Sequence, residues 1–485
     1  MQINEYINIS IPEAIREYIF IEAEGQTVTR VYYHNSVVTQ AVWKTFKEEI
    51  KAQYPTVLFQ LVDDISIINE KKYGARKEQI KNTTNEEIIR LIRAIILDAY
   101  KQNASDIHIE VQDALNVYFR VNGFLIKTRH SNTREMGKQI ISAIYNNAVG
   151  SSHTTYSEYE YQFAKLPPNA EIIPSDVEIE AIRVQTGPMH GGNFAVLRLL
   201  YKNTNFTLKL GSDLDETIRG TFVDLYGYSI STAKRIKPVL LGAEGLVVIS
   251  GITGSGKSTA LKLMLEFIHA IYPDKAKFTI EDPPEYIIKG AKQLPVPENR
   301  DFDEILKVAM RADPDIIMVG EVRDNKTAET IKRAVLTGHQ SFTTVHARDI
   351  STIFSRFADL GMDLEELIRS NLIKLLISQR LIPKLCDKCK KPRELYNGLT
   401  VYEKGDGCEA CKFTGISGRI VVEECLNFED LAIIESPDYI RDYLTERKLS
   451  MKHKAISYIR KGIVSITHVR QFIDYISEEE VEENV

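Results

Sequence analysis

The sequence lacks any long uninterrupted run of apolar residues. None of its 485 residues fall in an apolar stretch of about 18 residues, the length needed to cross a bilayer as a helix. The first residues, MQINEYINISIPEAIREYIF, also lack the basic start and the apolar centre of a secretory signal. We therefore expect no transmembrane segment, and any role at a membrane must depend on docking to a membrane partner.

Cysteine is scarce, and positive charge is not in excess. The five cysteines do not suggest a disulfide framework in a chain of this length. The 61 basic and 67 acidic side chains give a net charge of −6, which argues against a general nucleic-acid binder, although a local basic patch remains open. With 44% hydrophobic and 26% charged residues, the composition is that of a globular protein with room for two or three domains.

The N-terminal part of the chain divides into two regions. Residues 1–80 mix short apolar runs with charged segments and match no motif. Residues 84–205 predict a small α+β domain, in which a helix begins at Thr84 with Glu87 at the capping-box distance. Alternating strands around an Asn-Gly turn and a looser Gly-rich turn follow that helix.

The C-terminal part has a different pattern. Residues 206–215 form a polar linker, and residues 216–485 alternate strands with helices, which is typical of a parallel α/β sheet. The last residues, SEEEVEENV, are acidic, and we expect them to form a solvated, frayed tail.

The segment SGITGSGKST is a phosphate-binding loop. The apolar run before it predicts a buried parallel strand, and the residues after it predict a helix whose N-terminus faces the phosphate. The glycines let backbone N–H groups turn toward a phosphate, Lys257 can reach the β- and γ-phosphates, and the Ser258 hydroxyl can bind Mg²⁺. The predicted nucleotide contacts are Gly251, Thr253, Gly254, Ser255, Gly256, Lys257, Ser258 and Thr259.

Two further predicted strands end in carboxylates. One is followed by Glu281, Asp282 and Glu285, and the other by Glu321. Parallel strands present their C-terminal ends at the edge that carries the phosphate loop, where carboxylates can hold Mg²⁺ and orient or deprotonate water. Taken alone, each acidic cluster could equally be a solvated loop.

The second carboxylate strand departs from the usual nucleotide motif. Gly320 stands where that motif has an aspartate, so Glu321 must be the acidic group, acting directly or through water. In the segment TGHQSFTTVHARD, His339 and His346 flank another short apolar run, from which they could sense the γ-phosphate. A lone histidine is more often structural, so their spacing alone does not decide their role.

Five segments, in this order and at this spacing, resemble the secretion ATPase superfamily, in particular the type II secretion and type IV pilus assembly ATPases. They are GITGSGKST, TIEDPPEY, RADPDIIMVGEVRDNKTAETI, LTGHQSFTTVHARD and LISQRLIPKLC. Three earlier segments, ASDIHIE, YFRVNGFL and IRVQTGPMHGGNFAVLRLL, resemble that family's N-terminal domain. The resemblance covers residues 84–425 and implies a RecA-like P-loop ATPase domain preceded by a smaller, PAS-like α+β domain.

The resemblance also implies roles for individual side chains. In this family the glutamates of the acidic box and of the second nucleotide motif share Mg²⁺ positioning and water activation. Here they are Glu285 and Glu321, and the two jobs cannot be divided between them. The matching residues are Glu281, Asp282 and Glu285 in the acidic box, Glu321 in the second motif, and His339 and His346 in the histidine box.

Three arginines match family arginines that reach from the N-terminal domain to the phosphates. They are Arg120, Arg183 and Arg198. An arginine delivered by a moving domain would neutralise transition-state charge and couple domain closure to hydrolysis. The alternative for each is an exposed ion pair. Asn122 stands where the family usually has aspartate, and it supports an Asn-Gly turn equally well.

Four cysteines have the spacing of a zinc site. Cys386 and Cys389 form one Cys-x2-Cys pair, and Cys408 and Cys411 form a second pair eighteen residues later. Four thiolates leave no open position for water, so we predict a structural Zn²⁺ in a knuckle over residues 386–411; the alternative is four reduced thiols. In the resembling family this knuckle marks the extension and secretion branch, and retraction ATPases lack it.

Together these features predict a motor ATPase that hydrolyses MgATP between the subunits of a ring, with a homo-hexamer implied by the resemblance. At the cytoplasmic face of the inner membrane it would drive a platform protein to assemble a pilus or a pseudopilus. The alternatives are a pilus retraction ATPase, a nucleic-acid translocase on the same fold, and a regulatory protein without turnover. The net charge and the lack of an aromatic–basic stripe argue against nucleic acid.

Overall fold

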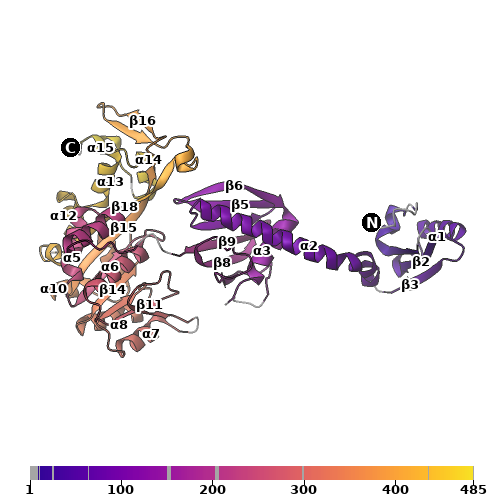
Figure 1. Cartoon of the computed structure of the whole chain (residues 1–485), viewed down its shortest axis with the longest axis horizontal. Helices are drawn as coiled ribbons and strands as arrows, with labels where there is room; N and C mark the ends of the chain where they lie inside the picture. Colours follow the sequence, from indigo (N-terminus) through magenta and orange to yellow (C-terminus); the bar gives the residue numbers. More distant parts are fainter. Residues whose placement is uncertain are drawn as a thin grey trace.

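The computed structural model contains three successive units, the first two of which are connected by a long helix. It describes residues 9, 11–24, 27–63, 65–149, 155–202, 207–297, 300–434, 436–473 and 475–483. Figure 1 shows the units side by side along the longest axis, with the smallest, N-terminal unit at one end and the largest at the other.

The first unit is a three-stranded sheet covered by one helix. The strands lie in the order β1-β2-β3, with β1 antiparallel and β3 parallel to β2. Helix α1 buries Trp43, Phe46 and Ile50 against the sheet. The elements are η1 (Glu13–Tyr18), β1 (Ile19–Glu24), β2 (Thr27–His34), η2 (Asn35–Val37), α1 (Ala41–Gln53) and β3 (Leu58–Val62).

Helix α2 (Ile65–Lys101) runs from the first unit to the second. Near its start it packs against all three strands of the first unit, and toward its end it packs against α3 and β4 of the second. The prediction that a helix begins at Thr84 is therefore wrong, because the backbone is already helical from Ile65 onward. The expected boundary between residues 1–80 and residues 84–205 falls inside this helix.

The second unit is an antiparallel six-stranded sheet with two helices on one face. The strand order is β6-β5-β4-β9-β8-β7, and alternate side chains of these strands form a core with α2 and α3. This is the predicted α+β domain; its likeness to a PAS domain stays a prediction. The elements are β4 (Asp106–Val111), β5 (Ala114–Val121), β6 (Phe124–Thr133), α3 (Arg134–Asn146), β7 (Gln162–Leu166), β8 (Ile179–Met189) and β9 (Gly192–Tyr201).

The third unit is built on a seven-stranded sheet in the order β12-β11-β13-β14-β10-β15-β18. The first six strands are parallel and β18 is antiparallel to its neighbour, which gives the predicted α/β class. The strands are β10 (Gly245–Ser250), β11 (Lys277–Glu281), β12 (Ala291–Pro295), β13 (Ile316–Val319), β14 (Gln340–Val345), β15 (Ile373–Leu385) and β18 (Ile416–Asn427).

Helices cover both faces of this sheet. On β10, Leu246 and Val248 face a core that includes α7, α8 and α9, while Val247 and Ile249 face a core with α5 and α6. Cys425 is buried in the second of these cores, as predicted. The helices are α4 (Leu214–Ile218), η3 (Arg219–Leu225), α5 (Ile230–Leu240), α6 (Lys257–Ile271), α7 (Phe302–Met310), α8 (Asn325–Leu336), α9 (Ile350–Asp359), α10 (Leu364–Arg369) and α11 (Phe428–Leu431).

The last helices pack beside the short β16–β17 hairpin, which lies between the two cysteine pairs in the sequence. The acidic end of the chain is docked, contrary to prediction: Val481 is buried, and Arg460 donates hydrogen bonds to the carbonyls of Val481 and Glu482. None of the described helices is both long and apolar enough to span a bilayer. The elements are β16 (Lys391–Glu394), β17 (Thr400–Glu403), η4 (Glu409–Cys411), η5 (Pro437–Tyr439), α12 (Ile440–Glu446), α13 (Met451–Arg460), α14 (Ile466–Phe472) and α15 (Glu478–Glu483).

Candidate nucleotide site and metal centre

The phosphate loop lies at the C-terminal end of β10, between β14 and β15. Helix α6 begins directly after it, at Lys257. Gly254 and Gly256 have φ values of 77° and 90°, a left-handed conformation that favours glycine. A Cβ at Gly251 would lie 2.6 Å from the carbonyl oxygen of Gln379. The conformation of the loop therefore depends on the glycines that the motif supplies.

The Lys257 amine is held by the loop itself. Its Nζ donates hydrogen bonds to the carbonyls of Gly251 and Ile252, at 2.8 and 3.2 Å. Burial lowers the pKa of Lys257 to about 8, although the nearby Glu321 carboxylate acts to raise it. A phosphate at this place would favour the charged amine and raise that pKa again.

Glu321 follows β13 and lies among cationic groups at the same edge. It forms an ion pair with Arg323, and its second carboxylate oxygen lies 3.3 Å from His346 Nε2, within hydrogen-bond reach of that ring. Arg323 also reaches Asp282, at 3.5 Å, so one guanidinium bridges the second motif and the acidic box. Burial, followed by the charge of Lys257, lowers the pKa of His346 and so favours its neutral form near pH 7.

The acidic-box carboxylates lie in different environments. Glu281 is buried, and its Oε1 accepts hydrogen bonds from the Thr279 hydroxyl at 2.6 Å and from the Gln293 amide at 3.0 Å. Burial raises the pKa of Glu281. Glu285 is half-buried and makes no hydrogen bond or ion pair within the described part of the chain, so its carboxylate is the more available of the two.

His339 lies at the opposite edge of the sheet from the phosphate loop. It directly precedes β14, and its carbonyl accepts the N–H of Gly245, the first residue of β10. Its Nδ1 lies 2.9 Å from the carbonyl of Ala334 in the last turn of α8. The expectation that both histidines stand beside the γ-phosphate is therefore corrected: His346 reaches that edge, and His339 does not.

The three predicted arginines and an aspartate form one row across the second unit's sheet. Arg120 pairs with Asp106 across β5 and β4, Arg198 pairs with Asp106 across β9 and β4, and Arg183 is opposite Arg198 on β8. Asp106 accepts a 2.9 Å hydrogen bond from Arg198 and lies 3.8 Å from Arg120. Arg183 instead donates to the carbonyl of Pro283 in the acidic-box segment, at 3.3 Å.

The second and third units also meet at the predicted Asn-Gly turn. Asn122 has a φ of 51°, a conformation that asparagine tolerates. The ring of Phe124, after the turn, lies 5.3 Å from the ring of His468 and 6.0 Å from that of Phe472. The Lys404 amine lies 5.6 Å from the same ring. This aromatic contact is independent of the Arg183 contact.

Sequence reasoning missed several residues that support the site. Arg323 stands two residues after Glu321, and Gln379 lies in the quoted segment LISQRLIPKLC, so both were on motifs already singled out. Tyr226, Tyr228 and Asp106 lie outside the nucleotide motifs, and nothing in their spacing pointed to the site.

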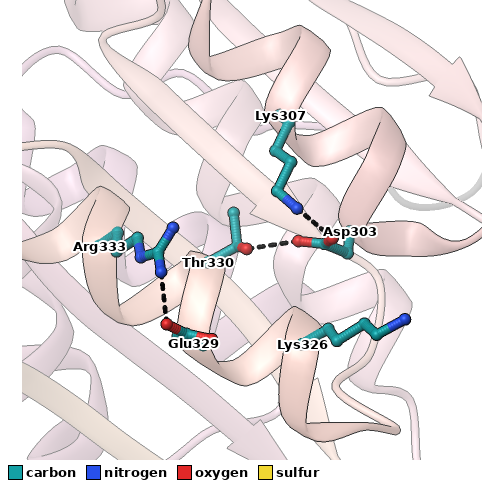
Figure 2. A pocket seen from close by; sticks show the side chains of 6 residues that line it. All are labelled: Asp303, Lys307, Lys326, Glu329, Thr330 and Arg333. Carbon is teal, nitrogen blue, oxygen red and sulfur yellow. Dashed lines mark hydrogen bonds and ion pairs between the residues drawn. The ribbon is translucent and has the colours of Figure 1, made fainter.

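A polar hollow of about 270 Å³ lies elsewhere, between α7 and α8. Figure 2 shows that its charged groups pair with one another: Lys307 and Thr330 approach Asp303, and Arg333 approaches Glu329. Lys326 points away from these pairs in the same view. Its three basic and two acidic side chains leave a net charge of +1, which belongs to Lys326, outside these pairs. Its lining residues are Asp303, Lys307, Lys326, Glu329, Thr330 and Arg333.

The four cysteines of the two Cys-x2-Cys pairs come together between β15 and β18. Their Sγ atoms all lie within 4.8 Å of one another, and the separations are 3.7 Å for Cys386–Cys408 and 3.8 Å for Cys389–Cys411 and Cys408–Cys411. A tetrahedral zinc ion with Zn–S bonds of about 2.3 Å requires separations of about 3.8 Å. The backbone N–H groups of Cys408 and Gly415 point at Cys411 Sγ and would stabilise a thiolate. The cluster therefore fits zinc.

Fold and site define a P-loop nucleotide-binding protein with a cysteine knuckle. The sequence pattern of the family described as "Type II/IV secretion system protein" matches residues 81–471, and the chain belongs to this family. It is 29% identical to the type II secretion system ATPase E of Vibrio cholerae, over 92% of this chain and 88% of that protein. It is 34% identical to the type IV pilus assembly ATPase PilB of Thermus thermophilus, over 70% of this chain and 37% of that protein.

A solved structure supports the fold. The ATPase DotB of Legionella pneumophila matches with a TM-score of 0.52 over 78% of this chain and 93% of that chain, at 21% sequence identity. At that identity the likeness bears on the fold alone.

Proposed function

We propose that this chain is a motor ATPase that hydrolyses MgATP to drive assembly of a type IV pilus or of the pseudopilus of a type II secretion system. The observation that carries the proposal is the convergence of Lys257, Glu321 and His346 at the edge where the phosphate loop ends. Family membership supports the same function.

The phosphate loop would bind the triphosphate with its backbone N–H groups and with Lys257, which would exchange its two carbonyl acceptors for phosphate oxygens. Ser258, at the start of α6, would supply a hydroxyl ligand to Mg²⁺. The bound Mg²⁺ would neutralise charge that develops on the phosphate oxygens.

Glu321 and Glu285 would orient and deprotonate the attacking water. Glu321 is already paired with His346 and Arg323, so its carboxylate is fixed at this edge. Neutral His346 carries a single N–H, which could move from the Glu321 carboxylate to a γ-phosphate oxygen and so report whether the phosphate is present. We propose that Asp282 acts beside them, while Glu281 supports the segment from within the sheet.

Arg183 would couple hydrolysis to movement. It is the arginine of the second unit that already contacts the acidic-box segment. Arg120 and Arg198 are held by Asp106 on the same row, and closure of this sheet over a nucleotide would bring their guanidinium groups toward the phosphates. The linked motion of the second unit is the mechanical output that we propose.

The cysteine knuckle would hold a structural Zn²⁺ through its four thiolates. It closes the end of the β15–β18 pair, and its Lys412 amine contacts the carbonyl of Lys101 at the end of α2. A metal there would therefore stabilise a surface against which the second unit docks.

We further propose that the chain works as a homo-hexameric ring at the cytoplasmic face of the inner membrane, on a platform protein of the fibre machinery. The support is family membership and the similarity to a type II secretion ATPase and to a type IV pilus assembly ATPase.

The test is replacement in the source cell of the wild-type chain by the Glu321→Gln variant, scored for surface fibres and for secreted proteins. Glu329→Gln is the matched control, since Glu329 is exposed on α8 and pairs with Arg333 on the same helix. Loss of fibres alone selects the pilus, and loss of secreted proteins selects the secretion system. Normal fibres and normal secretion would contradict the proposal.

A further inference from the structure

The back of the phosphate loop is held by three side chains that lie outside the loop itself. Gln379 lies on β15, the strand beside β10, and its side chain is fully buried. Tyr226 and Tyr228 lie between η3 and the start of α5, and their rings meet edge to face with centroids 4.6 Å apart. Segments that lie some 150 residues apart thus meet behind the loop.

These side chains form a directional chain of hydrogen bonds. Tyr228 donates to Gln379 Oε1. Gln379 Nε2 donates both of its N–H groups, one to the Tyr226 hydroxyl and one to the carbonyl of Ser255, each at 2.7 Å. Tyr226 then donates to the carbonyl of Gly256 at 2.9 Å. The Gly256 carbonyl also accepts the N–H of Ala260 in the first turn of α6, at 3.0 Å. The order of donors and acceptors fixes the orientation of the Gln379 amide.

Holding these two carbonyls fixes the two N–H groups that follow them. In a planar trans peptide the C=O and the next N–H point in opposite directions. With the carbonyls of Ser255 and Gly256 tied to the back of the loop, the N–H groups of Gly256 and Lys257 point to its front. The first N–H groups of a helix have no acceptor within the helix, so at the start of α6 they are available to a phosphate.

We propose that Tyr226 and Gln379, supported by Tyr228, are positioning residues that preset the phosphate-binding N–H groups of Gly256 and Lys257. The inference rests on the proposed binding of a nucleoside triphosphate at this loop. Preset donors bind a phosphate without the cost of ordering the loop on binding. Burial raises the pKa of both tyrosines, so both hydroxyls stay protonated and remain donors across the physiological range.

The position of the two tyrosines adds a second consequence. They lie just after the segment that leads from the second unit into the third, and η3 and α5 flank them on either side. The tyrosines therefore connect the linker side of the third unit to the floor of the nucleotide site.

The test is nucleotide binding by the purified full chain with Tyr226→Phe. The substitution removes one hydroxyl and leaves the ring. A lost hydrogen bond of this kind is worth about 1 kcal/mol, so the dissociation constants for MgADP and for a non-hydrolysable MgATP analogue should rise about 5-fold. Gln379→Leu removes both donors and should raise them at least about 10-fold. Because the contact is kept from ground state to transition state, the KM for ATP should rise with kcat changed less than about 2-fold.

The matched control is Tyr443→Phe. Tyr443 is also buried, and its hydroxyl donates to Asp430 at 3.0 Å, away from the loop. Tyr443→Phe should lower the unfolding temperature, as Tyr226→Phe does, and should leave nucleotide affinity unchanged. Unchanged affinity in Tyr226→Phe, or an equal loss in Tyr443→Phe, would overturn the inference. A wild-type chain that binds neither nucleotide would instead contradict the proposed function.

Discussion

A lysine and a histidine stand at each edge of the seven-stranded sheet, and the two edges use them differently. At the C-terminal edge, Lys257 and His346 lie near the Glu321 carboxylate. Their hydrogen-bonding groups face the place where the phosphate loop would receive an anion. Both residues are therefore available to a ligand.

At the N-terminal edge the same residue types serve the fold. The Lys277 amine, which is buried, donates to the carbonyls of Tyr272 and Lys275 just after α6. His339 Nδ1 donates to the carbonyl of Ala334 in the last turn of α8. Both side chains satisfy carbonyls at helix ends.

The difference follows from the direction of the chain. In a parallel sheet with crossover helices, each helix begins at the C-terminal edge of the sheet and ends at the N-terminal edge. Free N–H groups gather at one edge and free carbonyls at the other, so an anion is stabilised at the first and a cation at the second. Residue type alone does not tell which task a side chain has.

The largest expected effect is that of Glu321→Gln at the C-terminal edge. Removing the carboxylate charge should lower kcat for ATP hydrolysis at least about 100-fold, because water activation and Mg²⁺ positioning are both weakened. ATP affinity should stay within a few-fold of wild type. Steady-state phosphate release and equilibrium nucleotide binding measure the two quantities, with Glu329→Gln as control. Wild-type turnover would remove Glu321 from the mechanism.

Removal of zinc tests the knuckle, which lies beyond the sheet at the end of β15. The purified chain should carry one zinc per chain, and a strong chelator should lower the unfolding temperature of the third unit, because metal binding contributes to folding there. Calorimetry with and without added Zn²⁺ checks this. Less than one zinc per chain in protein purified without chelators would count against the site.

The two histidines allow a direct comparison of the C-terminal and N-terminal edges of the sheet. His346→Ala should lower kcat about 10- to 100-fold, since the side chain faces Glu321. His339→Ala should leave kcat within about 2-fold and lower the unfolding free energy by about 0.5–2 kcal/mol, through loss of its contact with the end of α8. Phosphate release and urea unfolding separate the two effects. Equal losses of activity would break the assignment of the edges.

The smallest effect concerns Glu424 on β18, which accepts N–H groups of Ile350 and Met451 at the starts of α9 and α13. Burial raises its pKa to about 7. Between its ordinary value and 7, the folded chain keeps a proton that the unfolded chain has released. The contribution of Glu424 to stability is therefore full at low pH and is lost as the pH rises toward 7.

Glu424→Gln should remove this dependence. The free energy of unfolding of the variant minus that of wild type should be about 1–3 kcal/mol higher at pH 8 than at pH 5, because only wild type loses stability over this range. Urea unfolding at the two pH values measures it, with the exposed Glu429→Gln as control. If the stability difference between Glu424→Gln and wild type does not change with pH, the pKa of Glu424 in the folded chain lies near its ordinary value.

Local features of the molecule were predictable from the sequence, and long-range ones were not. The strand, loop and helix around Lys257 follow from a contiguous motif, and two Cys-x2-Cys pairs define a metal-sized cluster by their own short turns. The sequence predicts that His339 and His346 both lie near the γ-phosphate, because their motif is contiguous. A six-residue strand separates them, and at about 3.3 Å per residue that puts them about 20 Å apart.

The other features that the sequence did not predict have the same physical origin, which is contact between segments far apart in the chain. The role of Gln379 depends on the register of β15 against β10, which no local pattern reveals. The helix start predicted at Thr84 was overridden because α2 packs at both ends against folded units. The acidic end was expected to be solvated, yet Val481 is apolar and finds a core, and Arg393 and Lys452 pair with the surrounding glutamates.

The most direct test of the account compares Lys257→Ala with Lys277→Ala in the full chain, measuring steady-state phosphate release and thermal unfolding in parallel. Lys257→Ala should lose hydrolysis and lower the unfolding temperature less than Lys277→Ala does, because its two carbonyl contacts lie within the partly exposed phosphate loop. Lys277→Ala should keep kcat and unfold at a lower temperature, because its buried amine satisfies carbonyls after α6. Wild-type turnover by Lys257→Ala, or loss of turnover in a stable Lys277→Ala, would contradict the placement of the nucleotide site at the C-terminal edge.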